Sequence, residues 1–273
     1  MVGSTLAGYL GEHYGWRSAF LVLGGAGIVL ALAAAVVLRG KDLPPAREDR
    51  EAAAQPVAAR RALRQLLGFS SYWVLLVQSM IVAVGIWLYL NWLPLYFKET
   101  FGLSLAGAGF FGAALLEFPG LLRVVAGGQL SDLVARRSSA TRMLVQTVCY
   151  LAGAGMLLTF TNQVSFPLIA GAVFGFSFLR SIAVANENPL LCDLLAPKQR
   201  STAIGFMNAA NTFAGGVGVF AVGILKRDYA LGDIFAGVSL ILLAAAGVTA
   251  LGYRFVLPRD LRRGAAACLK RIE

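Results

Sequence analysis

The chain has 273 residues, of which 58% are hydrophobic and only 14% are charged. Soluble domains carry about 25% charged residues, so this composition excludes an ordinary soluble domain. The net charge of +10 does not indicate a nucleic-acid partner, because the basic residues flank long apolar segments. Basic residues in such places set membrane orientation and contact the anionic lipid of a bilayer.

Seven apolar segments are each long enough to cross a bilayer, which takes about 20 helical residues. They lack a polar face, as expected for helices that are surrounded by lipid or packed in a bundle. We therefore predict an all-α membrane protein with seven complete transmembrane helices, preceded by part of another at 2–10. The predicted spans are 18–38, 72–93, 103–122, 143–160, 166–184, 203–225 and 234–253.

One long polar connection, 39–71, divides the chain. Its mixed charges and prolines predict a linker that leads into an amphipathic surface helix at 57–67. If this segment is cytoplasmic, most of the 24 lysine and arginine residues also lie on the cytoplasmic side, as the positive-inside rule requires. The predicted parts are the end of an N-terminal half at 1–38, a cytoplasmic central loop at 39–71, a six-helix half at 72–256 and a cytoplasmic tail at 257–273.

The residues that usually build metal or catalytic centres are scarce. The three cysteines, Cys149, Cys192 and Cys268, have no paired spacing and predict free thiols. A single histidine, His13, cannot form a multi-histidine metal site. We expect no cofactor, no metal and no enzymatic activity.

A glycine-led, arginine-ended string, GGQLSDLVARR, follows the third complete span at 127–137. Its Asp132 is placed to cap a helix start and meet the positive end of the helix dipole. The string resembles the G-x-L-x-D-x-x-x-R-R loop of the major facilitator superfamily, which recurs in each half of those transporters. It departs from that pattern at Leu133 and Ala135, and the alternative is a generic basic inner loop. The resemblance implies a conformational-switch loop made of Gly128, Asp132, Arg136 and Arg137.

A second string, GYLGEHYGWRSAF at 8–20, resembles the outer loop between the fifth and sixth helices of that superfamily. It lies one span before the long linker, and six spans follow the linker, which matches a complete C-terminal half. The resemblance implies the C-terminal two-thirds of a transporter of the major facilitator type. We expect an upstream coding region for about four more helices, so the missing N-terminal helices would be a partner of this chain.

Two further strings, at 92–110 and 185–208, resemble the anion:cation symporter branch, whose members move organic anions such as sugar acids. This implies a secondary active transporter that moves a small, sugar-acid-like organic anion with a proton or a sodium ion, by alternating access. It would be a multi-pass protein of a bacterial inner membrane with a cytoplasmic C-terminus. The alternatives are a proton-coupled efflux antiporter and a non-transporting fragment. Efflux antiporters carry G-P-x-x-G-G in the fifth helix, where this chain has Ser4 in place of proline.

Two charges inside the predicted spans are candidates for function, because a charge within a bilayer is costly to retain. Arg180 can bind the anion, or it can belong to a gate or packing network. Glu117 can carry the coupling ion, or it can be the structural partner of an arginine.

Neutral polar groups in the spans add further substrate-binding candidates. Tyr89, Asn91 and Trp92 combine aromatic and amide groups that suit a sugar, although aromatic residues also mark the membrane boundary. Asn208 and Asn211 lie on one helix face, where amides either line a cavity or bond to other helices.

Overall fold

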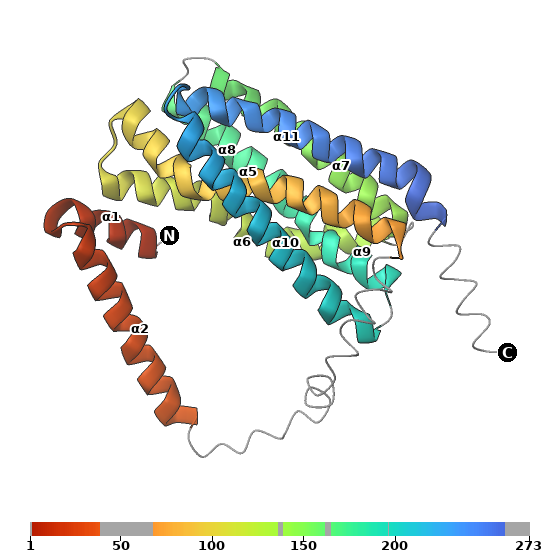
Figure 1. Cartoon of the computed structure of the whole chain (residues 1–273), viewed down its shortest axis with the longest axis horizontal. Coiled ribbons are helices and arrows are strands. Elements are labelled where there is room, and N and C mark those ends of the chain that lie inside the picture. The colour runs from red at the N-terminus through yellow and green to blue at the C-terminus, as the bar shows by residue number, and fades with distance from the viewer. Residues whose placement is uncertain (1, 39–67, 136–138, 162–164, 196, 260–273) are drawn as a thin grey trace. The chain divides into compact units, whose positions relative to one another are not determined.

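The computed structural model describes residues 2–38, 68–135, 139–161, 165–195 and 197–259. Within these residues there are two compact units, one made from 2–38 and 93–114 and the other from 68–92 and the described residues of 115–259. The α-helices drawn in Figure 1 are α1 (Val2–Tyr14), α2 (Trp16–Leu38), α5 (Ser70–Phe101), α6 (Leu105–Ala135), α7 (Ser139–Leu157), α8 (Phe166–Ala185), α9 (Glu187–Leu194), α10 (Pro197–Leu225) and α11 (Leu231–Leu251).

Among the described residues, seven helical segments are long and apolar enough to cross a membrane. They coincide with the seven predicted spans, so the all-α membrane fold is confirmed. Several helices run further than their apolar segments. α5 has 32 residues and continues past Pro94 to Phe101, because the fall in hydropathy marks the end of the apolar stretch and not the end of the helix. The surface helix predicted at 57–67 lies outside the described residues.

In the first unit, a tight turn at Gly15 joins α1 to α2. Gly15 has a φ of 82°, a left-handed conformation that favours glycine. The Ser18 hydroxyl lies 2.7 Å from the Gly15 carbonyl and 3.2 Å from that of Leu10, so it caps the turn. In the same unit, α1 packs tightly on the start of α6. A Cβ atom placed on Gly8 would lie only 2.6 Å from the Leu105 carbonyl oxygen, so glycine allows this close contact.

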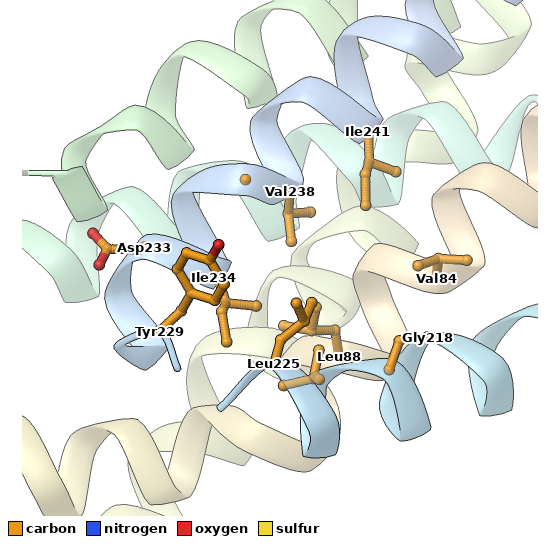
Figure 2. Close-up of a pocket in the computed structure, with 12 residues that line it drawn as sticks. Val84, Leu88, Gly218, Leu225, Tyr229, Asp233, Ile234, Val238 and Ile241 are labelled. Atoms are coloured by element: carbon orange, nitrogen blue, oxygen red, sulfur yellow. The ribbon is translucent and has the colours of Figure 1, made fainter. Parts of the chain in front are cut away.

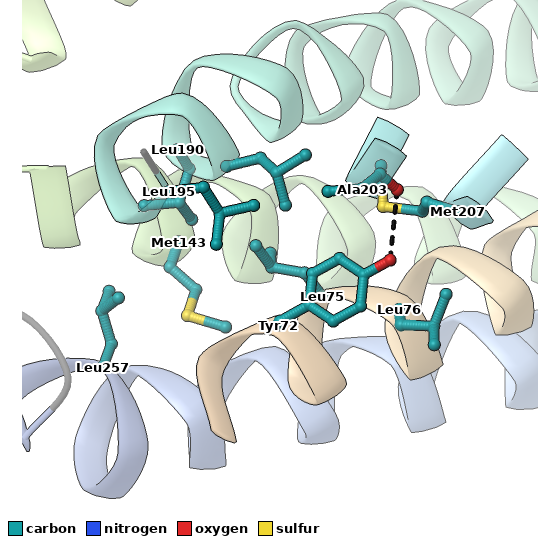
Figure 3. Close-up of a cluster of buried hydrophobic side chains, with 10 residues drawn as sticks. Tyr72, Leu75, Leu76, Met143, Leu190, Leu195, Ala203, Met207 and Leu257 are labelled. Atoms are coloured by element: carbon teal, nitrogen blue, oxygen red, sulfur yellow. Dashed lines mark hydrogen bonds between the residues drawn. The ribbon is translucent and has the colours of Figure 1, made fainter. Parts of the chain in front are cut away.

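In the second unit, α7 packs against both α8 and α11, and α7 and α11 run side by side in Figure 1. A hydrophobic cluster packs residues of α5, α7, α9 and α10 together (Figure 3). Its central polar contact is the Tyr72 hydroxyl, which donates to the Ala203 carbonyl at 3.1 Å. The buried members are Tyr72, Leu75, Leu76, Met143, Leu190, Leu191, Leu195, Ala203, Met207 and Leu257.

A second core of the same unit is aromatic. The ring of Tyr89 stacks on that of Phe235, with centroids 4.7 Å apart, and Phe160 and Phe176 pack around it. The Tyr89 hydroxyl donates to the Phe235 carbonyl at 3.3 Å, which satisfies the polar end of a fully buried side chain. Tyr89 therefore joins α5 to α11.

The predicted switch loop has a different backbone from the one we expected. α6 remains helical from Leu105 to Ala135, so Gly128 and Asp132 lie in its last turns. The expectation that Asp132 caps a helix start is therefore wrong: Asp132 is near a helix end. The sequence favoured a cap because glycine and aspartate are common at helix boundaries, yet both also occur inside long helices. Arg136 and Arg137 lie outside the described residues.

Candidate functional site

A cavity of about 210 Å³, here called the polar cavity, lies in the second unit between α5, α8, α9 and α10. Of the described residues that line it, Arg180 is the one basic side chain and Glu187 the one acidic side chain. The lining residues are Ser79, Val82, Ala83, Ile86 and Trp87 of α5, Arg180 and Val184 of α8, Glu187 and Asn188 of α9, and Met207, Asn208 and Asn211 of α10.

The structure brings together three of the residues singled out from the sequence. Arg180 faces the polar cavity from α8, and Asn208 and Asn211 face it from α10. The spacing of three between the two asparagines places both on one helix face, as the helical repeat requires. The cavity therefore combines a guanidinium, which is always charged, with amide groups that donate and accept hydrogen bonds.

A break between α8 and α9 places Glu187 in the cavity wall. At Asn186, the backbone N–H bonds to the Ala183 carbonyl at 3.1 Å and the side-chain amide donates to the Ile182 carbonyl at 2.9 Å. A new helix begins at Glu187, and Pro189 in its first turn needs no intrahelical N–H partner. The predicted span 166–184 therefore matches α8, and α9 extends the apolar stretch beyond the break to Leu194.

Two arginines hold α9 in place. Arg200 donates to the carbonyls of Leu195, at 3.2 Å, and Cys192, at 2.8 Å, and so satisfies groups at the C-terminal end of α9. Arg142, at the start of α7, lies 3.9 Å from the carboxylate of Asp193. These contacts fix the far end of α9 and thereby the position of Glu187.

Ser79 and Asn211 connect α5 to α10 beside Glu187. The Ser79 hydroxyl lies 3.0 Å from the Leu76 carbonyl and 2.9 Å from Oδ1 of Asn211, and the Glu187 carboxyl is a third acceptor that competes for its single proton. The Glu187 carboxyl lies next to Ser79. Its Oε1 atom has no hydrogen-bond partner among the described residues, although Glu187 is only 7% exposed.

Behind the cavity wall lies a further set of buried polar groups that sequence reasoning missed. Tyr150 of α7 is almost fully buried, and its hydroxyl lies near the Gln78 amide and the side chains of Glu187 and Arg180. Gln78 itself has no exposed surface. A signal existed: Gln78, Ser79 and Tyr150 are single polar residues within apolar spans, where polar groups usually face the bundle interior.

Other predicted residues lie elsewhere. Tyr89 is in the aromatic core, where it has no exposed surface. Asn91 is exposed, and its amide donates to the Trp87 carbonyl at 2.7 Å. Trp92 is half-buried, with the Lys226 ammonium 5.9 Å from its ring centroid. Glu117 is exposed on α6. None of these four lines the polar cavity.

A second hollow, here called the apolar groove, has a volume of about 360 Å³ and lies between α5, α10 and α11 (Figure 2). Aliphatic side chains from all three helices converge in it, with Tyr229 and Asp233 at one end. The lining residues are Val84, Leu88, Gly218, Ala221, Val222, Leu225, Tyr229, Asp233, Ile234, Gly237, Val238 and Ile241. Within the described part of the chain, no group of three His, Cys, Asp or Glu residues is placed to hold a metal ion.

Comparisons with known proteins give one consistent result. The family model described as Major Facilitator Superfamily matches residues 1–219. The chain is 28% identical over 263 residues to a probable sulfoacetate transporter, SauU, of Cupriavidus necator, covering 89% of this chain and 58% of that protein. It is 28% identical over 250 residues to an MFS-type efflux pump of Mycolicibacterium smegmatis, covering 88% of this chain and 55% of that protein.

A solved structure supports the same fold. It is the crystal structure of a bacterial homologue of the human lysosomal transporter Spinster, with a TM-score of 0.62 at 18% identity. The match covers 95% of this chain and 66% of that one. The chain spans about half the length of the two relatives named above.

Proposed function

Because the chain belongs to the Major Facilitator Superfamily, we propose that it moves a small organic anion across a membrane by alternating access. The observation that supports this most directly is Arg180 in a cavity lined by asparagines. An anion that leaves water for a cavity of low dielectric needs a fixed positive partner. A guanidinium meets a carboxylate or sulfonate with two parallel, charge-assisted hydrogen bonds, which a point charge cannot reproduce.

The finer parts of the proposal are the substrate, the coupling ion and the location. Similarity to a probable sulfoacetate transporter favours a small organic anion, and the amides of Asn208 and Asn211 suit the further oxygens of a sugar acid. The coupling ion is a proton or sodium, with Glu117 as the candidate from sequence. The location is a bacterial inner membrane, with the C-terminus in the cytoplasm as the distribution of basic residues indicates.

Uptake of labelled anions tests this proposal. Cells or membrane vesicles that produce the protein should accumulate sulfoacetate, D-glucarate or both above vector controls. If a protonophore abolishes accumulation, the coupling ion is a proton. If replacement of sodium by potassium abolishes it, the coupling ion is sodium. Uptake no greater than the control for every anion, with the protein verified in the membrane, would overturn the proposal.

The second candidate is efflux of apolar compounds, which the apolar groove and the similarity to a mycobacterial efflux pump both favour. A lipophilic dye loaded into cells should then leave faster when the protein is present. Export of the dye without any anion transport would establish efflux of apolar compounds as the function.

A further inference from the structure

We propose that Glu187 forms a second subsite of the polar cavity, which binds a hydrogen-bond-donating group of the substrate, either a hydroxyl or an ammonium. Arg180 would bind the anionic group at the other subsite. This inference rests on the proposed function and narrows its substrate class. The favoured ligands are hydroxylated or amino-substituted organic anions, in preference to simple dianions.

The first argument is the hydrogen bonding around Glu187. The residue is buried, faces the cavity and has an oxygen, Oε1, that accepts no hydrogen bond from the described residues. Its neighbour Ser79 has one proton, for which the Leu76 carbonyl, Oδ1 of Asn211 and the Glu187 carboxyl all compete, so Ser79 cannot satisfy both carboxyl oxygens. A buried acceptor without a donor is unfavourable, and a ligand hydroxyl or ammonium in the cavity would remove that cost.

The second argument is the set of charges around this carboxyl. On α8 the cavity presents Arg180, on α7 Tyr150 lies near the carboxyl, and on α9 itself Asp193 is paired with Arg142. The lining residues of α5 and α10 are uncharged. A second anionic group of the ligand beside Glu187 would therefore be repelled, whereas a donor would be attracted.

The third argument is the placement of the two side chains. Arg180 lies in the C-terminal part of α8 and Glu187 begins α9, so the two side chains line the cavity from opposite sides of the break at Asn186. The contacts of Arg200 and Arg142 hold α9, so this placement is built into the fold. A ligand several bonds long, with its anionic group at one end and its donor at the other, can reach both subsites.

Three sulfonates of nearly equal size provide the test. Sulfoacetate ends in a second anion, isethionate ends in a hydroxyl and taurine ends in an ammonium. Isothermal titration of the full chain in lipid nanodiscs should give at least tenfold tighter binding of isethionate or taurine than of sulfoacetate. The relative order of those two identifies whether the subsite takes a hydroxyl or an ammonium.

The matched variant is Glu187→Gln, which keeps the shape and removes the charge. It should erase the preference by weakening taurine or isethionate about tenfold while leaving sulfoacetate unchanged or tighter. Glu99→Gln makes the same chemical change at an exposed site at the end of α5 and should alter none of the three affinities.

Two results would overturn the inference, and they are distinguishable. Equal binding of the three sulfonates by the wild-type chain, still dependent on Arg180, removes the donor subsite and leaves the proposed function intact. Failure of all three, and of D-glucarate, to bind removes the proposed function as well. The preference of the wild-type chain decides the matter even if Glu187→Gln does not fold.

Discussion

The polar cavity and the apolar groove lie along the same two helices, α5 and α10, yet they differ completely in chemistry. The cavity takes Ser79 and Trp87 from α5 and two asparagines from α10, whereas the groove takes Val84, Leu88 and the aliphatic second half of α10. The same two helices therefore supply a polar environment to one ligand site and a mainly apolar environment to the other. The cavity can stabilise an anion through Arg180, whereas the groove is mainly aliphatic, has Asp233 as its charged lining residue and favours ligands that bury apolar surface.

The contact that separates the two hollows depends on glycine. Gly215 of α10 lies against the Trp87 indole, which lines the cavity, and Gly218 lies against Val84, which lines the groove. A Cβ atom on Gly218 would be 2.8 Å from the nearest Val84 methyl group. Close packing of α5 on α10 at this point keeps the polar and apolar spaces apart.

Removing the positive charge of the polar cavity should give the largest effect on anion binding. Arg180→Ala should weaken binding of an organic anion by roughly 30-fold or more, since truncating a buried charge partner costs about 2–5 kcal/mol. Arg180→Lys should lie between, because it keeps the charge and loses the bidentate geometry. Titration with an anion and a neutral analogue measures both. If Arg180→Ala weakens the binding of the anion and the neutral analogue equally, Arg180 belongs to a gate or packing network. The polar cavity would then have no special affinity for anions.

Disturbing the contact between the hollows should give the next largest effect. Gly215→Ala places a methyl group where the Trp87 indole now lies, so the indole must move, at a cost in stability of about 1–3 kcal/mol. We expect a lower midpoint of thermal unfolding and several-fold weaker anion binding. Gly216→Ala is the control, because a Cβ atom there meets nothing within 4 Å. Equal effects of the two variants would mean that helix propensity, and not the position of Trp87, is responsible.

Tyr72→Phe separates folding from binding. It removes the hydrogen bond to the Ala203 carbonyl and keeps the ring in the hydrophobic cluster, so we expect a loss of about 1 kcal/mol in stability. Anion affinity should stay the same, because Tyr72 does not line the cavity. Tyr14→Phe, at an exposed position, should leave both unchanged. A change in affinity for Tyr72→Phe would show that the cluster is coupled to the cavity.

Ile241→Ala in the groove should give the smallest effect on an anion. The side chain is half-buried, so the loss of stability should be small, about 1 kcal/mol, and anion binding should be unchanged. Export of a lipophilic dye is the sensitive readout. If that export changes while anion transport does not, the groove is a separate site for apolar compounds.

Hydropathy was enough to predict the seven membrane-spanning helices, because a segment that crosses a bilayer must be both apolar and about 20 helical residues long. The sequence also indicated Arg180, Asn208 and Asn211 as polar groups on inward faces, and the structure brings them together. It could not place Tyr89, since the same tyrosine suits a sugar site, a membrane boundary or an aromatic core. Only the packing of Phe160, Phe176 and Phe235 around it decides that.

Glu187 shows a different limit. Its spacing from Arg180 predicts a shared face on a continuous helix, but the break at Asn186 decides where the carboxyl lies. Ser79 and Tyr150 could be noticed as polar residues within apolar spans, but the sequence does not show which groups they meet, because those groups lie on other helices. Long-range partners are set by tertiary packing, which periodicity does not encode.

The length of α5 has a consequence for the lipid around the protein. Its 32 residues correspond to about 48 Å of helix, while the hydrocarbon core of a bilayer is about 30 Å thick. Such a helix must tilt, or extend into the headgroup layers, and the balance between the two changes with acyl-chain length. Since α5 forms walls of both hollows, bilayer thickness becomes a variable that acts on them directly. Nanodiscs of short-chain and long-chain lipids should therefore give different ligand affinities for one unchanged sequence.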